Sequence, residues 1–259
     1  MNKVERPRSA SVGLKDRSLE GWFNEDTGEV ATGVTIRASD TVIDVGCGDG
    51  GVIRFCAAQG AEVIFIDRDK ARLKSTEARV AEFAARAYRG ILSDCNPIPV
   101  EDATGDVVIC TEVLEHVPDP VLFLAELVRI TKPGSQLLLT VPDSRSEELV
   151  APTAPPQYFQ EPNHIRIFSA DDFKALVLGA GLEIESHQFL GSFWSIFWPL
   201  SWMTCEPGGG LPIDNKHPIV ENWVSLWAHL QRHPDGGKIR NALNQLLPKS
   251  QSIVARKPM

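Results

Sequence analysis

From Thr41 onward the chain alternates short apolar runs with longer segments of helical composition. Five of the runs have the character of buried strands, rich in β-branched residues: TVIDVG, AEVIFID, YRGILSD, GDVVICTE and SQLLLTVP. Strands that alternate with helices are joined by right-handed crossovers, which place neighbouring strands in parallel. LEIESHQFL and SIVARKP are expected to complete a seven-stranded, doubly wound, mainly parallel α/β sheet of Rossmann-like type.

Two of the intervening segments carry clear helix signals. DKARLKSTEARVAEFAARA is of helical composition, and Leu73, Glu77 and Val80 are expected near its inner face. In DPVLFLAELVRI, Asp119 and Pro120 are typical of an N-cap followed by a first helical turn. The helical spacing predicts a buried stripe on the second helix at Val121, Leu124, Ala125 and Val128.

The overall composition limits the class of protein. With 259 residues, 43% of them apolar and 23% charged, the chain can form one large α/β domain with an appendage. Its net charge of -8 argues against nucleic acid as a partner, because nucleic-acid binders present a basic face. The five cysteines form no C-x-x-C pair, which favours buried thiols and a cytoplasmic protein.

The ends of the chain depart from the alternating pattern. Residues 1–34 are expected to be a flexible tail without a secretory signal, followed by an N-terminal lid segment. Residues 35–188 would form the core domain, 189–247 an aromatic-rich helical cap, and 248–259 the last core strand. The stretch FLGSFWSIFWPLSW is too short and interrupted to span a bilayer, so no stable membrane insertion is expected.

The first strand runs into a glycine-rich turn, TVIDVGCGDGG. Gly46, Gly48 and Gly51 match the G-x-G-x-x-G pattern of nucleotide-binding turns, in which a pyrophosphate usually approaches the backbone. Asp44 lies two residues before the first glycine, and its carboxylate would repel a phosphate. S-adenosylmethionine has no phosphate and carries a cationic ammonium and a sulfonium, so a carboxylate at Asp44 favours it, directly or through local hydrogen bonds.

Two further aspartates end the next strands. Asp67 follows the first glycine by about 20 residues, where an acidic side chain can accept hydrogen bonds from ribose hydroxyls in either cofactor class. Asp94, at the end of the third strand, is expected to meet the exocyclic amine of an adenine. These residues indicate an adenosine-containing ligand without identifying which one.

The segments VIDVGCGDGG, IFIDRD, GILSDCNPIPVEDATGDVVICTEVLEHVPDP and ITKPGSQLLLTVPD together resemble the class I S-adenosylmethionine-dependent methyltransferases. The resemblance is to the small-molecule branch that includes ubiquinone and menaquinone biosynthesis enzymes, and it extends from Thr41 to Asp143. It implies that Asp67 holds the ribose, with Arg68 beside the adenine. It further assigns three groups of residues: Gly46, Cys47 and Gly48 to the methionine part, Asp94 and Cys95 to the adenine edge, and Thr111 and Glu112 to the sulfonium.

Methyl transfer is an in-line displacement that requires a base only if the acceptor must lose a proton. Histidine titrates near neutral pH and is the natural candidate for this role. His116, in EVLEHVPDP, and His164, in EPNHIRIF, lie in loops after the fourth and fifth strands and are the candidate catalytic residues. His229 and His233 have a helical i, i+4 spacing but no third ligand, so no metal site is expected.

The aromatic segment after Phe189 contains Trp194, Trp198 and Trp202, with Trp223 and Trp227 further on. Core packing or a homodimer interface explains such a segment as well as an aromatic pocket or lid for an apolar acceptor does. We expect a lid built from residues 21–32, 152–164 and 189–202, which would exclude water and hold the acceptor in line.

The interpretation is therefore a methyltransferase that uses S-adenosylmethionine and a small, partly apolar acceptor, methylated at oxygen, nitrogen or carbon. One alternative is an NAD(P)-dependent oxidoreductase, which Asp44 and the absence of a Tyr-x-x-x-Lys pair disfavour. A non-catalytic protein that retains the cofactor fold is the other.

Overall fold

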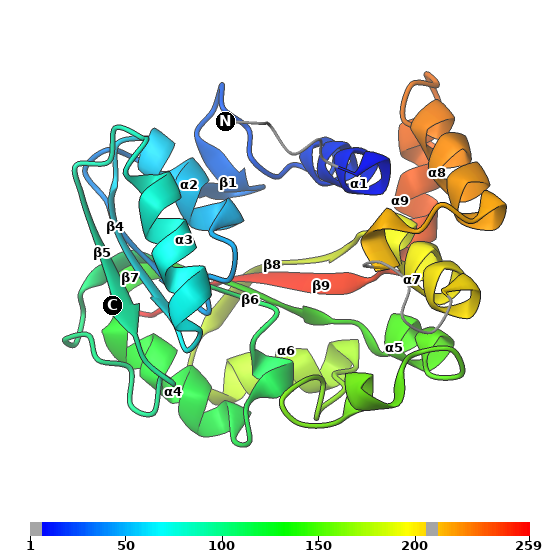
Figure 1. The fold of residues 1–259 in the computed structure, drawn as a ribbon. Coiled ribbons are helices and arrows are strands. Elements are labelled where there is room, and N and C mark those ends of the chain that lie inside the picture. Colours follow the sequence, from blue (N-terminus) through cyan, green and yellow to red (C-terminus); the bar gives the residue numbers. More distant parts are fainter. Residues whose placement is uncertain (1–6, 206–211) are drawn as a thin grey trace.

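The computed structural model describes residues 7–205 and 212–259, and Figure 1 shows their arrangement. Within these residues the main sheet has seven strands in the order β5-β4-β3-β6-β7-β9-β8. The five parallel strands are β3 (Thr41–Val45), β4 (Glu62–Asp67), β5 (Ala87–Leu92), β6 (Gly105–Thr111) and β7 (Thr131–Pro142). β8 (Glu183–Leu190) and β9 (Ser250–Arg256) pair with each other in antiparallel fashion, and β9 is also antiparallel to β7. The predicted mainly parallel seven-stranded sheet is confirmed.

Each face of the sheet is covered by helices that connect its strands (Figure 1). One face packs on α4 (Pro120–Ile130) and α6 (Ala170–Gly179), and the opposite face on α2 (Gly51–Ala58) and α3 (Lys70–Val80). A small hairpin of β1 (Glu29–Ala31) and β2 (Val34–Thr35) extends the second of these cores. Because both faces are covered, the central strands are mostly apolar and buried, with Asp44 of β3 as a buried exception.

A group of helices stands at the carboxyl ends of the strands. It comprises α1 (Arg8–Leu19), α5 (Ser144–Val150), α7 (Ser192–Thr204), α8 (Pro218–Leu230) and α9 (Gly236–Leu246), with 3-10 turns at Leu114–His116, Pro156–Phe159 and Pro212–Asp214. Residues of α1, α7 and α8 share a separate apolar core that includes Val12, Phe193, Phe197 and Trp227. Residues 206–211 of the expected cap lie outside the described residues.

The chain near the N-terminus differs from the expected flexible tail. Residues 1–6 lie outside the described part, but α1 is a regular helix, and buried Asp16 accepts a hydrogen bond of 2.9 Å from Trp227 Nε1 on α8. Tertiary contact therefore orders a segment whose own sequence has little apolar periodicity.

Two helix predictions need correction in detail. Asp119 does cap α4, since its carboxylate accepts from the backbone N–H groups of Val121 and Leu122. The predicted buried stripe of α4 is only half right, because Leu124 is buried and Val128 packs against the core, whereas Val121 is 63% exposed and Ala125 is also exposed. The side chains that face the sheet are Phe123, Leu124, Leu127 and Ile130.

α3 likewise ends earlier than predicted. It ends at Val80, since the chain must turn back for β5 to pair with β4 from Ala87 onward. Thr76 and Val80 are its buried residues, whereas Glu77, expected on the inner face, is exposed. The cysteine prediction is confirmed more closely: four thiols are free and buried, and Cys205 is half-buried.

Candidate active site

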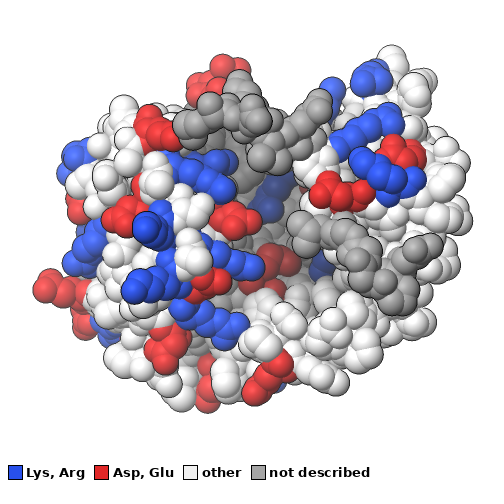
Figure 2. Space-filling model, in the orientation of Figure 1, with Lys and Arg blue, Asp and Glu red and all other residues white. Residues whose placement is uncertain are grey.

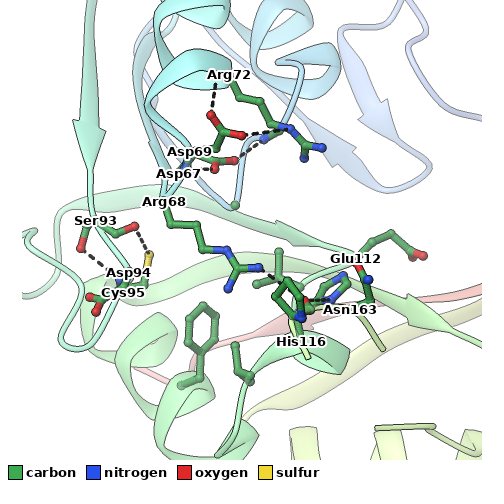
Figure 3. Close-up of a pocket in the computed structure, with 16 residues that line it drawn as sticks. Asp67, Arg68, Asp69, Arg72, Ser93, Asp94, Cys95, Glu112, His116 and Asn163 are labelled. Atoms are coloured by element: carbon green, nitrogen blue, oxygen red, sulfur yellow. Dashed lines mark hydrogen bonds and ion pairs between the residues drawn. The ribbon is translucent and has the colours of Figure 1, made fainter. Parts of the chain in front are cut away.

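A cavity of about 370 Å³ opens at the carboxyl ends of β3, β4, β5 and β6. This position is the topological switch point of the sheet, where β3 is followed by β4 on one side and bordered by β6 on the other. Figure 3 shows its acidic and basic side chains, which come from separate strand ends. Its walls include Gly46, Gly48, Asp67, Arg68, Asp94, Cys95, Glu112, Val113, His116, Phe123, Pro162 and Asn163.

The glycine turn between β3 and α2 forms one wall. Gly46, Gly48 and Gly50 all have positive φ, and a Cβ at Gly46 would lie 2.4 Å from Val113 Cγ2. A Cβ at Gly48 would meet no atom of the described residues within 4 Å, so the backbone of Gly48 is accessible from the cavity. Only glycine at position 46 permits this close approach of the turn to the loop after β6.

The backbone N–H groups of the turn are already used within the protein. Gly46 N and Cys47 N both donate to Ile66 O, at 2.8 and 3.0 Å, and Gly50 N donates to Cys47 O at 2.9 Å. Gly48 N donates to Asp67 Oδ2 at 2.8 Å. A pyrophosphate binds through free N–H groups at such a turn, so these four donors do not provide a cradle for it.

Asp67 thus anchors the turn as well as facing the cavity. Its other oxygen, Oδ1, accepts a hydrogen bond of 2.8 Å from Asp69 N, which begins the N-terminal cap of α3. Asp67 is nearly buried but still lines the cavity. Asp67 is therefore placed for the ribose contact predicted from the sequence.

Asp44 has a different environment. Its side chain is fully buried, it is not part of the cavity wall, and its Oδ1 has no hydrogen-bond partner within the described residues. Burial, and secondarily the charge of Asp67, raises the pKa of Asp44 to about 7. Because the Asp44 side chain is not exposed to the cavity, it can affect a ligand only indirectly, through the glycine turn that follows it.

The far wall comes from the ends of β4 and β5. Asp94 is exposed there beside buried Cys95, and Phe123 supplies an apolar surface opposite them. Arg68 Nη2 donates across the mouth of the cavity to Pro162 O at 3.4 Å (Figure 3). Seven of the predicted cofactor-binding residues thus line this cavity. The other three, Asp44, Cys47 and Thr111, do not line it.

A model of a methyltransferase domain matches residues 26–187 of this sequence. The chain belongs to the methyltransferase domain family. The matched segment includes the glycine turn, every strand end that borders the cavity, and both candidate histidines.

Individual relatives agree with the family assignment. The chain is 39% identical over 122 residues to a ubiquinone biosynthesis O-methyltransferase from Pseudomonas paraeruginosa, in an alignment that covers 46% of this chain and 48% of that protein. The chain thus spans about half the length of the curated relatives it matches.

Solved structures show that the fold is shared. Geranyl diphosphate C-methyltransferase from Streptomyces coelicolor superposes with a TM-score of 0.58 at 14% identity, covering 96% of this chain and 80% of that one. A SAM-dependent methyltransferase from Aquifex aeolicus gives a TM-score of 0.51 at 20% identity, covering 71% and 93%. At these identities the likeness concerns the fold alone.

The two candidate histidines of this methyltransferase-family chain lie together but in different settings. Their ring centroids are 5.1 Å apart, yet His116 lines the cavity and His164 does not. His116 Nδ1 lies 3.1 Å from Pro162 O, and because a carbonyl only accepts, Nδ1 carries the proton. Burial lowers the pKa of His116, so the neutral ring leaves Nε2 as an unprotonated acceptor.

His164 belongs to a buried polar cluster around Glu147. Glu147 Oε2 accepts from His164 Nδ1 at 2.8 Å, and Oε1 accepts from Lys249 Nζ at 3.0 Å and from the Tyr158 hydroxyl at 3.1 Å. Burial alone would raise the pKa of Glu147, but these donors outweigh it and the pKa is lowered. Glu147 is thus a fixed anionic centre that orients His164 behind the cavity wall.

Glu115 lies close to both histidines. It is fully buried, and neither of its carboxyl oxygens has a hydrogen-bond partner within the described residues. Ligand atoms of Glu115, His116 and His164 lie within 4.8 Å of one another, a group able to share one metal ion. Sequence spacing gave no hint of this group, because the three side chains meet only in the tertiary structure. His229 and His233 are exposed and belong to no such group among the described residues.

A second, smaller cavity of about 130 Å³ adjoins the first, and Glu112 lines both. Figure 2 shows acidic and basic side chains inside the hollow between the core and the cap helices. Glu112 has a positive φ of 55°, uncommon for a residue with a side chain, and its Oε1 accepts from Thr140 Oγ1 at 2.9 Å. Such backbone strain is typical of functional sites.

Sequence reasoning missed most of this second cavity. Its walls include Arg17, Glu20, Trp22, Trp194 and Lys249, of which only Trp22 and Trp194 fell in segments proposed as a lid. The one signal in the sequence was Glu-Gly-Trp at residues 20–22, which is typical of a helix end at glycine.

Within the described residues, no helix is long and apolar enough to cross a membrane.

Proposed function

We propose that this chain transfers a methyl group from S-adenosylmethionine to oxygen, nitrogen or carbon of a small, partly apolar acceptor. The observation that carries the proposal is the hydrogen bonding of the backbone N–H groups in the glycine turn. Its N–H groups at positions 46, 47, 48 and 50 are all bonded within the protein, and a carboxylate occupies the place beside Gly48 that a phosphate would need. A cationic, phosphate-free adenosine cofactor suits this wall, whereas a dinucleotide does not.

The residues of the first cavity fit the parts of that cofactor. Gly46, Gly48 and Glu112 would border the methionine part, where open space and a carboxylate suit an ammonium. Asp67 would accept from the ribose hydroxyls, and Cys95 and Phe123 give the adenine an apolar wall beside Asp94. Thr111, Cys47 and Asp44 do not line the cavity and would affect the cofactor only indirectly, through the backbone of the strand ends and the turn. The bound cofactor supplies a sulfonium methyl that is open to in-line attack.

His116 is the candidate base for an acceptor that must lose a proton. Its Nε2 is the unprotonated nitrogen, since Nδ1 donates to Pro162 O, and it lies 3.6 Å from Glu115 Oε1. The lowered pKa of His116 keeps the ring neutral at physiological pH. His164, held by Glu147, would act from behind as a positioning residue for the ring of His116. Alignment and exclusion of water by the cap would supply the rest of the rate enhancement.

Calorimetry with S-adenosylhomocysteine and with NADH tests the proposal. We expect micromolar or tighter binding of S-adenosylhomocysteine and no binding of NADH. Transfer of a labelled methyl group into a small-molecule extract should then yield a labelled product that depends on His116. Binding of NADH in preference to S-adenosylhomocysteine would contradict the proposal.

The proposal includes a cytoplasmic location and leaves room for a homodimer through the aromatic cap. Trp198 and Trp202 stack along α7 at 5.7 Å and are only half-buried, which supports a further contact there. Cell fractionation and light scattering would test the two points separately.

A further inference from the structure

One cation in the second cavity, Arg17, stacks on an aromatic ring but has no hydrogen-bond acceptor among the residues that the structure describes. Arg17 makes no side-chain hydrogen bond or ion pair with any residue in the described ranges 7–205 and 212–259. The other cation there, Lys249, is bonded to Glu147 at 3.0 Å. The guanidinium of Arg17 is therefore the charged group of this cavity whose donors are unused.

The carboxyl groups of the same cavity are already engaged. Asp16 accepts from Trp227 Nε1, and Glu112 accepts from Thr140 Oγ1, both at 2.9 Å. Glu20 Oε1 accepts from Gly191 N at 3.0 Å and from Asn244 Nδ2 at 2.6 Å. Each acid thus has at least one fixed donor, although Asp16 Oδ2 has no hydrogen-bond partner among the described residues. The charges of Glu112 and Glu20 favour the charged form of Arg17 but do not hydrogen-bond to it, so its N–H donors remain open to a further acceptor.

The end of α1 holds Arg17 in place. Trp22 N donates to Arg17 O and Gly21 N donates to Ser18 O, both at 3.1 Å, with Gly21 at a φ of 87°. This is the Schellman arrangement, in which the residue after the glycine folds back onto the last turn of the helix. Here it brings buried Trp22 against Arg17, whose guanidinium carbon lies 3.9 Å from the ring centroid.

Stacking on an indole leaves the edge of a guanidinium free. Two parallel N–H groups on that edge match the two oxygens of a carboxylate, which a compact ammonium does not do. Unused donors in a half-buried site are costly, and a bidentate anion removes that cost.

The remaining wall suits a ring. Trp194 and Leu190 supply apolar parts of the cavity wall. The cavity volume of about 130 Å³ is of the same order as the roughly 150 Å³ of an apolar cavity that binds benzene, which limits an aromatic ligand here to a single small ring.

We propose that the second cavity is the acceptor site and that Arg17 binds a carboxylate carried by a small aromatic acceptor. The inference rests on the proposed methyl transfer and specifies its substrate class. Glu112, shared by both cavities, marks where the acceptor's nucleophilic atom would face the cofactor. The same chemistry also exists in the carboxylate of the cofactor's methionine part, and the test must separate the two sources.

The test uses benzoate and benzyl alcohol as probes, titrated into protein saturated with S-adenosylhomocysteine and followed by tryptophan fluorescence. Benzoate should bind at least tenfold more tightly than benzyl alcohol to the wild type. Arg17→Met should weaken benzoate at least tenfold and leave S-adenosylhomocysteine affinity within twofold, with Arg17→Lys in between. Lys15→Met, an exposed cation on the same helix, is the matched control and should change neither affinity.

A steric variant probes the same cavity without altering charge. A Cβ at Gly13 would lie 2.1 Å from Trp194 Cζ2, so Gly13→Ala must displace the ring and should weaken benzoate while sparing S-adenosylhomocysteine. Equal binding of the two probes, or an unchanged benzoate affinity in Arg17→Met, would overturn the inference. A tenfold loss of S-adenosylhomocysteine affinity in Arg17→Met would overturn it too, by assigning Arg17 to the cofactor. Failure of the wild type to bind S-adenosylhomocysteine would instead refute the proposed function.

Discussion

Replacement of Asp67 by alanine removes two different things at once. The carboxylate accepts backbone N–H groups from Gly48 and Asp69, both at 2.8 Å, and it faces the cavity where the ribose is proposed to bind. The variant should therefore lose stability and ligand affinity together. A matched control has to lose only the first of these, and Asp119 provides it, since its carboxylate also accepts two backbone N–H groups, at 3.0 Å, but lies away from the cavity.

The expected magnitudes follow from these bonds. Hydrogen bonds to a charged group contribute a net of about 1.5–3 kcal/mol each, and loss of a helix cap costs about 0.5–2 kcal/mol. Both variants should thus lower the melting temperature by several degrees, at about 2–4 °C per kcal/mol for a chain of this size. Loss of even one ribose hydrogen bond, about 1.4 kcal/mol, lowers affinity tenfold.

Calorimetric titration with S-adenosylhomocysteine distinguishes the two effects, with circular dichroism to verify the fold. Asp67→Ala should bind at least tenfold more weakly than the wild type, and Asp119→Ala should bind within twofold of it. The assignment of Asp67 would be refuted by unchanged affinity in its alanine variant, or by an equal loss in both variants.

Three further predictions concern the turn, the base and a buried acid. Gly46→Ala should weaken S-adenosylhomocysteine binding in calorimetry, because its Cβ would lie 2.4 Å from Val113 Cγ2; adding Val113→Ala should restore only part, as the positive φ of 80° stays strained. His116→Asn should lower kcat by about 10²–10⁴ if the acceptor loses a proton. Wild-type kcat should fall only below about pH 6.5, because the pKa of His116 is lowered from its ordinary value. A flat pH profile of kcat would exclude His116 as the base. The folded chain holds the Asp44 proton up to about pH 7 whereas the unfolded chain releases it near pH 4, so this group makes stability fall as pH rises between these values. Asp44→Asn should flatten urea-denaturation stability over that window by up to about 1.4 kcal/mol per pH unit, and an unchanged slope would count against the buried neutral acid.

The helix predictions show which features of a helix can be predicted from its local sequence. The cap at Asp119 could be predicted because it depends on residues adjacent in the chain. The buried face of α4 could be predicted only in part, because nearly every position of PVLFLAELVRI is apolar and several stripes satisfy the helical period. The sheet surface, not the helix itself, selects Phe123, Leu124, Leu127 and Ile130.

The cofactor wall was largely determined by the sequence. In a parallel sheet, residues that end consecutive strands must meet at one edge, so Gly46, Asp67, Asp94 and Glu112 could be brought together from strand order alone. Their motif spacing also identified the family. What this reasoning omitted was the second role of Asp67 as an anchor for Gly48, which depends on the direction of one N–H bond.

The proposed acceptor side was decided by tertiary structure. Arg17 enters the site because α1 packs on α8 and its Schellman end brings Trp22 back to the guanidinium, across contacts that no local period encodes. His116 rather than His164 reaches the cavity wall, because Glu147, from the helix after β7, draws His164 away from it. Residues that end consecutive strands indicate from the sequence where a cofactor would bind on a regular sheet. Which side chains face the acceptor depends on helices that pack across the end of that sheet, and only the folded chain sets those contacts.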